Sequence, residues 1–203
     1  MSLTFDGSTN TISGLVINST NITDGSIVNA DINASAAIAS TKLSGITSGI
    51  TMYDQWRFTA SPSVNQTPLS GSWERNDTNF DKIGTGMSVS SGVFTFPTTG
   101  IYQIFYQINF YTQSSTNYVG AYCQLSTDGG SNYTQFAYSY DQFASVSGYH
   151  YGCAEGNVGI DVTNTSNFKF TIHANGGSPT NANVQGSSTQ QTAGLTFIRM
   201  GDT

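Results

Sequence analysis

The side chains that could perform acid–base, nucleophilic or metal chemistry are few in this sequence. Its two histidines, His150 and His173, each stand without a second ligand at the spacing of a metal site. No serine lies in the glycine-flanked pattern of a hydrolase nucleophile. Two glutamates, Glu74 and Glu155, accompany aspartates that mostly occupy turn-like contexts. We therefore predict that the chain is not an enzyme and has no catalytic residue, metal site or cofactor. The weaker alternative is a glycosidase with two facing carboxylates.

One acidic motif has a structural explanation. Residues 126–133 resemble the Asp-box of sialidases, in which a serine, an aspartate and a glycine precede an aromatic residue. That box is a hairpin turn and does not itself catalyse a reaction. A single copy predicts a β-hairpin whose turn is held by Asp128.

Tyrosines in loop-rich stretches are the stronger candidates for contact with a ligand. A tyrosine offers a flat apolar face and a hydroxyl to a sugar or a protein surface. The long polar stretch 175–191 precedes the last predicted strand, and long loops often carry binding residues. Two alternatives stay open: half of the tyrosines point into the core or a subunit interface, and the polar stretch is only solvated. The candidate contact residues are Tyr138, Tyr140, Tyr149, Tyr151, Asn175, Asn181 and Asn183.

The composition excludes several classes of partner. Of the 203 residues, 9% are charged and 12% are aromatic, and the formal net charge is −6. Six lysines and arginines are too few for a phosphate-binding groove, so we expect neither nucleic acid nor an anionic membrane surface as a partner. We also expect no membrane insertion, because no apolar stretch is long enough to span a bilayer, and no secretory signal pattern is visible.

Residues 1–50 form a segment with isoleucines at a step of five residues. This period fits neither a helix nor a strand and resembles that of pentapeptide-repeat solenoids. So few repeats cannot close a core within one chain, and we therefore predict an oligomeric stalk in which several copies share their isoleucines. The alternative is a flexible tail that orders only on docking to a larger particle. The predicted stalk core consists of Ile12, Ile17, Ile22, Ile27 and Ile32.

Residues 51–203 contain almost all of the aromatic residues and predict a succession of strands. Over residues 100–111, large apolar side chains alternate with polar ones, which is the pattern of a long half-buried strand. Shorter stretches with the same alternation precede and follow it. Since no segment of useful length has a helical period, we predict an all-β fold with antiparallel strands in a sandwich.

The final predicted strand, residues 194–200, is apolar on both sides. Leu195 and Phe197 lie on one side, and Ile198 and Met200 lie on the other. A strand that is apolar on both faces is usually buried on both. We therefore expect one face of this strand in the core and the other in a subunit interface.

The two cysteines, Cys123 and Cys153, permit one disulfide but do not require it. Cys123 alternates with apolar residues that point inward, which favours a buried thiol. A Cys123–Cys153 bridge is the alternative.

The stretch 91–111 carries the most specific motif in the chain. Its residues Gly92, Phe94, Pro97, Gly100 and Tyr102 have a spacing that resembles the central signature of the complement globular-head family, which is related to tumour necrosis factor. Residues 55–61 resemble the first strand of that family, and residues 193–200 resemble its closing strand. The resemblance implies an antiparallel jelly roll packed as a tight homotrimer. The residues that we expect at the trimer interface are Trp56, Phe105, Tyr118, Tyr122, Ile198 and Met200.

Residues 24–46 resemble a low-complexity pattern that recurs in structural proteins of marine and cyanobacterial phages. This resemblance implies a bacteriophage virion protein, located in the particle as a trimeric fibre or spike subunit. We expect residues 1–50 to contact other virion proteins and residues 51–203 to form a head that contacts a glycan or protein of the host surface. The alternatives are a purely architectural capsid fibre or decoration protein without a receptor, and a polysaccharide-degrading spike.

Overall fold

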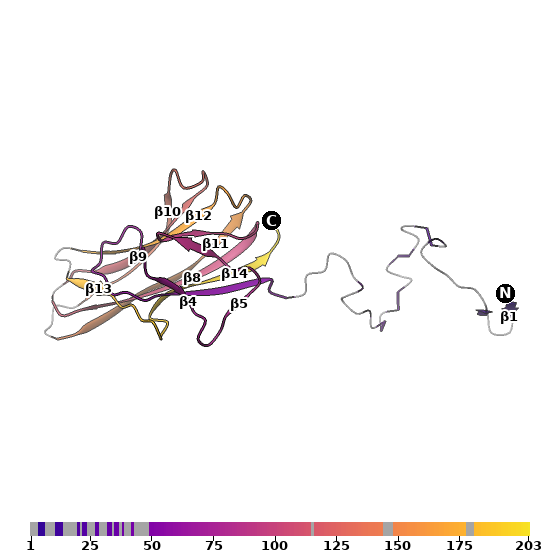
Figure 1. Cartoon of the computed structure of the whole chain (residues 1–203), viewed down its shortest axis with the longest axis horizontal. Helices are drawn as coiled ribbons and strands as arrows, with labels where there is room; N and C mark the ends of the chain where they lie inside the picture. Colours follow the sequence, from indigo (N-terminus) through magenta and orange to yellow (C-terminus); the bar gives the residue numbers. More distant parts are fainter. Residues whose placement is uncertain are drawn as a thin grey trace. The chain divides into compact units, whose positions relative to one another are not determined.

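The structure is a computed structural model of the chain that falls into two units, Met1–Ile46 and Thr47–Thr203 (Figure 1). It describes residues 4–6, 11–13, 20, 22–23, 27–28, 32–33, 35–36, 38, 42, 49–114, 116–143, 148–177 and 181–203. The two units are described separately below.

Among the residues that the structure describes in the first unit, β1 (Thr4–Asp6) and β2 (Thr11–Ser13) form a short antiparallel hairpin. Of the predicted stalk core, Ile12 lies on β2, and Ile17 lies outside the described residues. Ile22, Ile27 and Ile32 are 40%, 55% and 41% exposed. A single chain therefore leaves these three isoleucines in contact with solvent, and their burial between several copies stays a prediction.

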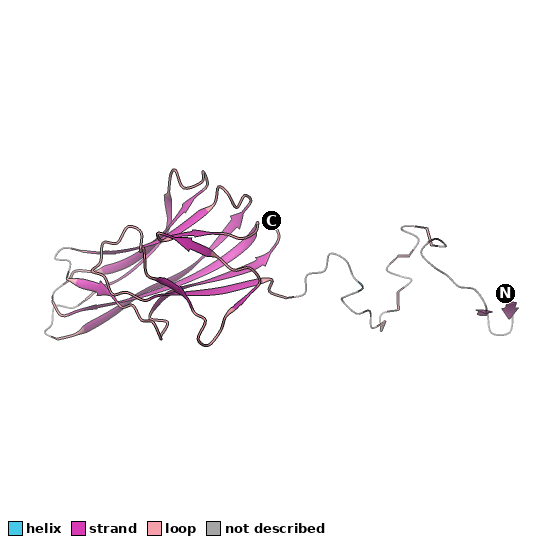
Figure 2. Cartoon of the chain, viewed as in Figure 1, coloured by secondary structure: helices cyan, strands magenta, loops and turns pink. Residues whose placement is uncertain are grey.

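The second unit is a sandwich of two antiparallel sheets, which confirms the predicted all-β jelly roll (Figure 2). One sheet has the order β10-β9-β12-β7-β6, and the other has the order β11-β8-β14-β3-β4, with β13 paired to β8 and β5 paired to β3. The strands are β3 (Met52–Phe58), β4 (Trp73–Arg75), β5 (Lys82–Ile83), β6 (Ser88–Ser90), β7 (Val93–Thr95), β8 (Gly100–Thr112), β9 (Val119–Ser126), β10 (Thr134–Asp141), β11 (His150–Val162), β12 (Lys169–Gly176), β13 (Ala182–Val184) and β14 (Ala193–Gly201).

The long strand β8 lies in the seven-stranded sheet between β11 and β14, and its alternation places one row of side chains in the core. Its buried residues, each at most 5% exposed, are Tyr102, Ile104, Tyr106, Ile108 and Phe110. At the start of the strand, a Cβ added to Gly100 would lie 2.5 Å from the carbonyl oxygen of Gly201. Only glycine therefore fits where β8 begins beside the end of β14.

A cluster of aromatic rings joins the two sheets. Phe94 on β7 packs against Phe197 on β14 with ring centroids 5.2 Å apart, and both rings contact Phe170 on β12. All three rings are fully buried. Because these rings come from both sheets, they stabilise the packing of one sheet on the other.

The closing strand β14 confirms part of its prediction. Leu195 and Phe197 are fully buried in the core, and Ile198 is half-buried on the outward side of the sheet. Met200 is 66% exposed and lies at the register shift between Arg199 and Gly201.

Asp54 on β3 is a fully buried carboxylate at the centre of a hydrogen-bond network. Its Oδ2 accepts hydrogen bonds from the backbone N–H of Met87 at 2.7 Å and from Nε1 of Trp56 at 3.0 Å. Arg75 on β4 donates to Oδ1 at 2.8 Å and lies over the Trp56 ring, 4.5 Å from its centroid. The carboxylate therefore links β3, β4 and the chain that leads into β6.

This network corrects one predicted interface residue. Trp56 is 7% exposed and packs against Phe94 within the core, at a centroid distance of 5.8 Å. Its ring is thus covered within one chain and does not reach a second subunit. The prediction was wrong because the inward side of β3 carries the aspartate and the tryptophan together.

The two cysteines are free thiols on different sheets, with Cys123 on β9 and Cys153 on β11. Cys123 is fully buried, and burial raises the pKa of its thiol to about 12. The structure therefore has a protonated, buried thiol at Cys123, as the alternation of its strand favours.

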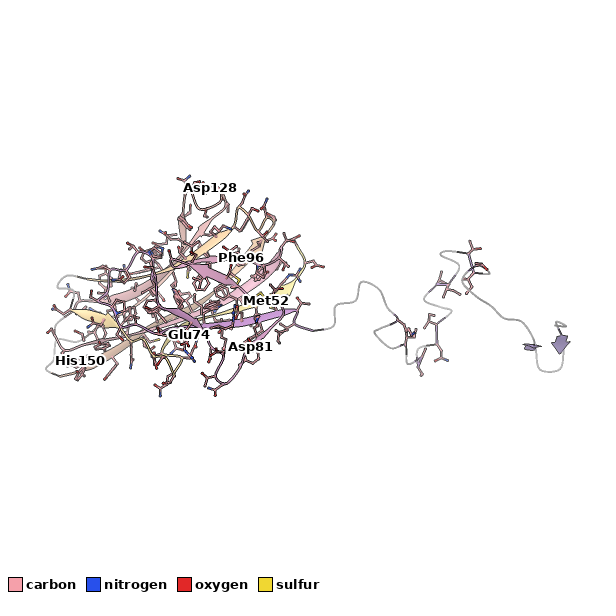
Figure 3. The ribbon with its side chains drawn as sticks, in the orientation of Figure 1. Met52, Glu74, Asp81, Phe96, Asp128 and His150 are labelled. Atoms are coloured by element: carbon pink, nitrogen blue, oxygen red, sulfur yellow. The ribbon has the colours of Figure 1, made fainter. Side chains whose placement is uncertain are left out.

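The hairpin between β9 and β10 contains the turn predicted at Asp128, whose labelled side chain lies at a loop tip in Figure 3. Its carboxylate accepts hydrogen bonds from Nδ2 of Asn132 at 2.7 Å, from the backbone N–H of Asn132 at 2.9 Å and from Oγ of Ser126 at 2.7 Å. These bonds, with those from Asn132 contributing most, lower the pKa of Asp128 to about 2.

The lowered pKa predicts an acid-dependent loss of stability. The ionised Asp128 carboxylate stabilises the folded state fully above its ordinary pKa of 3.8, and this contribution is lost as the pH falls through about 2. We expect Asp128→Asn to melt below the native protein at pH 6, and the difference in Tm to close between pH 4 and 2. Thermal unfolding across this range measures the difference, and a Tm gap that stays constant down to pH 2 would contradict the prediction.

A second prediction concerns the buried carboxylate. Asp54→Ala leaves the partly buried Arg75 and two buried N–H donors without their acceptor, so we expect the free energy of unfolding to fall by about 3–5 kcal/mol. Asp81→Ala is the matched control, because the Asp81 side chain is 72% exposed and lies 3.6 Å from Lys82. The control should change stability by less than about 0.5 kcal/mol. Equal losses in chemical denaturation would show that Asp54 has no special role.

Candidate ligand-binding surfaces

The predicted ligand-contact and trimer-interface residues fall into two groups, one on each sheet. Tyr122, Tyr138, Tyr140 and Asn175 belong to the five-stranded sheet, and Tyr118 directly precedes its strand β9. Phe105, Tyr151, Asn183 and Ile198 belong to the seven-stranded sheet, and Tyr149 directly precedes its strand β11. The residues predicted at the trimer interface therefore do not gather on one surface.

A hollow of about 490 Å³ lies at the β9–β10 edge of the five-stranded sheet. We call it the tyrosine hollow, and it is lined by Asn117, Tyr118, Tyr138, Tyr140 and Gln142. The antiparallel register explains why these residues line the same hollow, because Asp141 at the end of β10 pairs with Val119 at the start of β9. This pairing brings the residues that precede β9 beside those that end and follow β10.

An aromatic row extends from the tyrosine hollow across the sheet. Tyr140 and Tyr138 have ring centroids 5.7 Å apart and planes inclined by 32°. Tyr138 lies 6.3 Å from Tyr122, and Tyr122 stacks on His173 of β12 at 4.5 Å and 17°. Burial lowers the pKa of His173 to about 4, so the imidazole is neutral at pH 7 and packs as an aromatic ring.

Two glycines create space beneath this row. A Cβ on Gly177 would lie 2.6 Å from two carbons of the Tyr118 ring, so the ring packs directly against the backbone there. The N–H of Gly177 also donates a 2.9 Å hydrogen bond to the carbonyl oxygen of Tyr118. A Cβ on Gly120 would lie 2.9 Å from the hydroxyl of Tyr138 and 2.9 Å from Oδ1 of Asn175. These close approaches require glycine and hold the tyrosine rings in place.

The tyrosine hollow has an uncharged lining. Asp141 lies next to Gln142 in sequence, but its Oδ2 accepts the backbone N–H of Cys153 at 3.1 Å and its Oδ1 accepts that of Gln142 at 2.8 Å. Burial raises the pKa of Tyr138 and outweighs the hydrogen bond with the Asn175 side chain, which lowers it, while the neighbouring Tyr118 and Tyr140 raise it further. At neutral pH the hydroxyl of Tyr138 is therefore protonated and can donate a hydrogen bond.

The remaining predicted contacts form a second aromatic group at one end of the seven-stranded sheet. Tyr149 and Tyr151 stack with centroids 6.3 Å apart and planes inclined by 15°, and Tyr149 lies 6.4 Å from Tyr111. Tyr151 and Asn183 flank Tyr111 from β11 and β13. Asn181, which precedes β13, is exposed.

A further hollow, of about 500 Å³, lies on the outward face of the seven-stranded sheet. The strand register of this sheet forms one row across β11, β8, β14 and β3, which consists of Asn157, Phe105, Thr196 and Gln55. Phe105 is 44% exposed within this row. The face therefore presents an aromatic ring among polar side chains, of which Glu155 is charged.

Sequence reasoning missed Asn117, Gln142 and His173. The first two lie in connecting segments, whose partners depend on the register of β9 and β10. His173 stands alone in the sequence, and its stacking on Tyr122 depends on the pairing of β12 with β9. The alternation of β9 and β12 is the one signal that could have placed both rings on the same face.

The part of the chain that the structure describes contains no group of three or more His, Cys, Asp or Glu side chains that could hold a metal ion. Among those same residues, no helix has the length and apolar character needed to cross a membrane.

Comparisons with known proteins identify the fold. No family model and no curated protein matches the sequence. A crystal structure of murine APRIL matches with a TM-score of 0.51 and 12% identity, over 73% of this chain and 98% of that chain. The structure of Eiger TNF from S. frugiperda matches with a TM-score of 0.53 and 9% identity, over 76% of this chain and 96% of that chain. The second unit therefore has the jelly-roll fold of tumour necrosis factor.

Proposed function

We propose that this chain is a structural, non-enzymatic subunit of a bacteriophage virion, in the form of a homotrimeric fibre or spike. In this proposal the first unit attaches the protein to the particle, and the second unit is a head that contacts the host surface. The single observation that carries the proposal of self-association is the group of large apolar side chains exposed on the outward face of the seven-stranded sheet.

That face carries large apolar side chains that one chain leaves open to solvent. Phe80, Ile83, Ile101 and Phe105 are between 37% and 45% exposed. The register extends this apolar surface, because Ile83 pairs with Tyr53, which in turn pairs with the half-buried Ile198. Apolar groups gathered on a sheet face favour burial against another surface. The family resemblance of residues 91–111 supports a second and a third copy of this chain as that surface.

The first unit supports assembly for a similar reason. Its exposed isoleucines recur every five residues, and they gain burial only when chains associate. The likeness of residues 24–46 to phage structural proteins supports attachment to a virion.

The alternatives differ in what they require of the head. A purely architectural fibre or decoration protein needs the trimer but no ligand surface, so the uncharged tyrosine hollow favours a contact role over it. A polysaccharide-degrading spike needs two carboxylates that face one cleft. Glu155 is the one carboxylate that lines the hollow around Phe105, and none lines the tyrosine hollow.

The trimer predicts the effect of placing one charge at its interface. We expect the native chain to have three times the monomer mass in light scattering after size exclusion. Phe105→Glu should give monomers, because a buried carboxylate without a partner opposes association. Gln124→Glu is the control, since it places the same charge on the outward face of the five-stranded sheet and should leave the trimer intact. A monomeric native chain, or a Phe105→Glu variant that stays trimeric, would contradict the proposal.

The virion location predicts where the protein is found. Antibodies raised against the second unit should label the outside of purified phage particles in electron microscopy, because the head is displayed away from its attachment. Particles from which the protein is absent by mass spectrometry would overturn this part of the proposal.

A further inference from the structure

We infer that the tyrosine hollow binds an uncharged oligosaccharide. The inference deepens the proposed contact role, on which it rests, by naming the class of ligand and the residues that hold it. The shape of the hollow, its hydrogen-bonding groups, its charge, its rigidity and its position all support this class of ligand.

The rings of Tyr138 and Tyr140 provide the platform. Their centroids lie 5.7 Å apart, their planes are tilted by 32° to one another, and both tyrosines line the hollow. Tyr138 is 41% exposed and Tyr140 is 67% exposed. A pyranose ring has an apolar face of C–H groups that packs on such a surface, while its hydroxyls stay at the edge. Two adjacent rings therefore suit consecutive sugar units better than a single small molecule.

The polar groups around the platform match sugar hydroxyls. The side chains of Asn117 and Gln142 each contain an amide N–H donor and a carbonyl acceptor, and a tyrosine hydroxyl can both donate and accept. A sugar hydroxyl both donates and accepts, so it can satisfy such a mixed set.

The charge of the hollow selects against acidic ligands. No charged side chain among the described residues lines it, and the Oδ2 of Asp141, which precedes Gln142 in the sequence, accepts a hydrogen bond from the backbone of β11. An anionic sugar, a phosphate or a nucleic acid would lose hydration there without gaining a counter-charge. The net charge of −6 on the chain opposes their approach as well.

The hollow is held rigidly by the fold. The Tyr118 ring rests on the backbone of Gly177, and the Tyr138 hydroxyl occupies the space that Gly120 leaves open. The main-chain pairing of β9 with β10 fixes the spacing of the two walls. A site that is already formed spends little free energy on ordering when a ligand binds.

The position of the hollow suits contact with a surface. The chain enters the head at Met52, which pairs with Arg199 near the end of β14, and Figure 3 shows Met52 and His150 at opposite ends of the head. The tyrosine hollow lies toward the His150 end, because Val119 and Asp141 close β9 and β10 on that side, just as Thr112 and His150 do for β8 and β11. Three copies in one trimer would multiply weak contacts with a polysaccharide by about a hundredfold or more.

The test uses the full chain and soluble probes. We would titrate the protein with maltohexaose, laminarihexaose and mannohexaose as neutral probes, and with hexagalacturonate as the charged probe. Isothermal calorimetry gives the Kd, and saturation-transfer NMR shows which sugar protons contact the protein. We expect at least one neutral probe to bind and hexagalacturonate not to bind.

Paired variants locate the site. Tyr140→Ala should raise the Kd about tenfold or more, because it removes half of the platform. Phe136→Ala is the matched control, since Phe136 is 40% exposed on the same strand β10 but does not line the hollow, and it should leave the Kd unchanged. Circular dichroism and light scattering establish that both variants stay folded and keep the oligomeric state of the native chain.

Each opposing outcome overturns the inference. It fails if none of the neutral probes binds, if hexagalacturonate binds more tightly, or if the two variants weaken binding equally. It also fails if binding to host cells survives periodate and is abolished by proteinase, because the ligand is then a protein. If the protein is a trimer that binds no sugar, this inference alone is wrong. If it is a monomer that binds sugar, the proposed trimer is wrong and this inference stands.

Discussion

The buried carboxylate of Asp54 is the constraint on which the edge of the seven-stranded sheet depends. Burying an ionised carboxylate is costly unless all of its lone pairs are used, and here Trp56, Arg75 and the N–H of Met87 use them. The same contacts fix the Trp56 ring against Phe94, and so connect the polar network to the aromatic core between the sheets. One side chain thus joins β3, β4 and the start of the five-stranded sheet, and its loss would disturb all three.

Once both sheets are held in this way, alternation along each strand decides what faces outward. On β8, the side chains on one side fill the core, and Phe105 on the other side is left on the outward face. On β10, Tyr138 and Tyr140 face outward as part of the aromatic row. Burial of His173, which belongs to the same row, keeps its imidazole neutral. The two surfaces are therefore consequences of one packing arrangement. Both are aromatic, amide-rich and nearly free of charge.

The sequence could predict features that depend on local pattern, and it failed where the partner lies far along the chain. The alternation of β8 and the turn at Asp128 were predictable because strand period and turn chemistry act over a few residues. Trp56 was placed at an interface because nothing near it in the sequence reveals the ion pair between Asp54 and Arg75, which lie on different strands. Tyr122 and Phe105 were assigned to one interface although they face opposite sides of the sandwich. Deciding between these sides requires the register of each strand, which a single sequence does not contain.

The scarcity of charge has a consequence for how this head can recognise anything. All three arginines are engaged within one chain, Arg57 with Glu74, Arg75 with Asp54, and Arg199 with Asp202. Apart from Glu155 beside Phe105, the two hollows are lined by hydroxyls, amides and aromatic rings, which bind through short-range contacts and not through long-range attraction. Such contacts are individually weak and almost independent of salt concentration. A protein that works in this way gains strength from the number of identical surfaces presented together, and this is the physical reason why a repeated, symmetric assembly suits this chain better than a single copy.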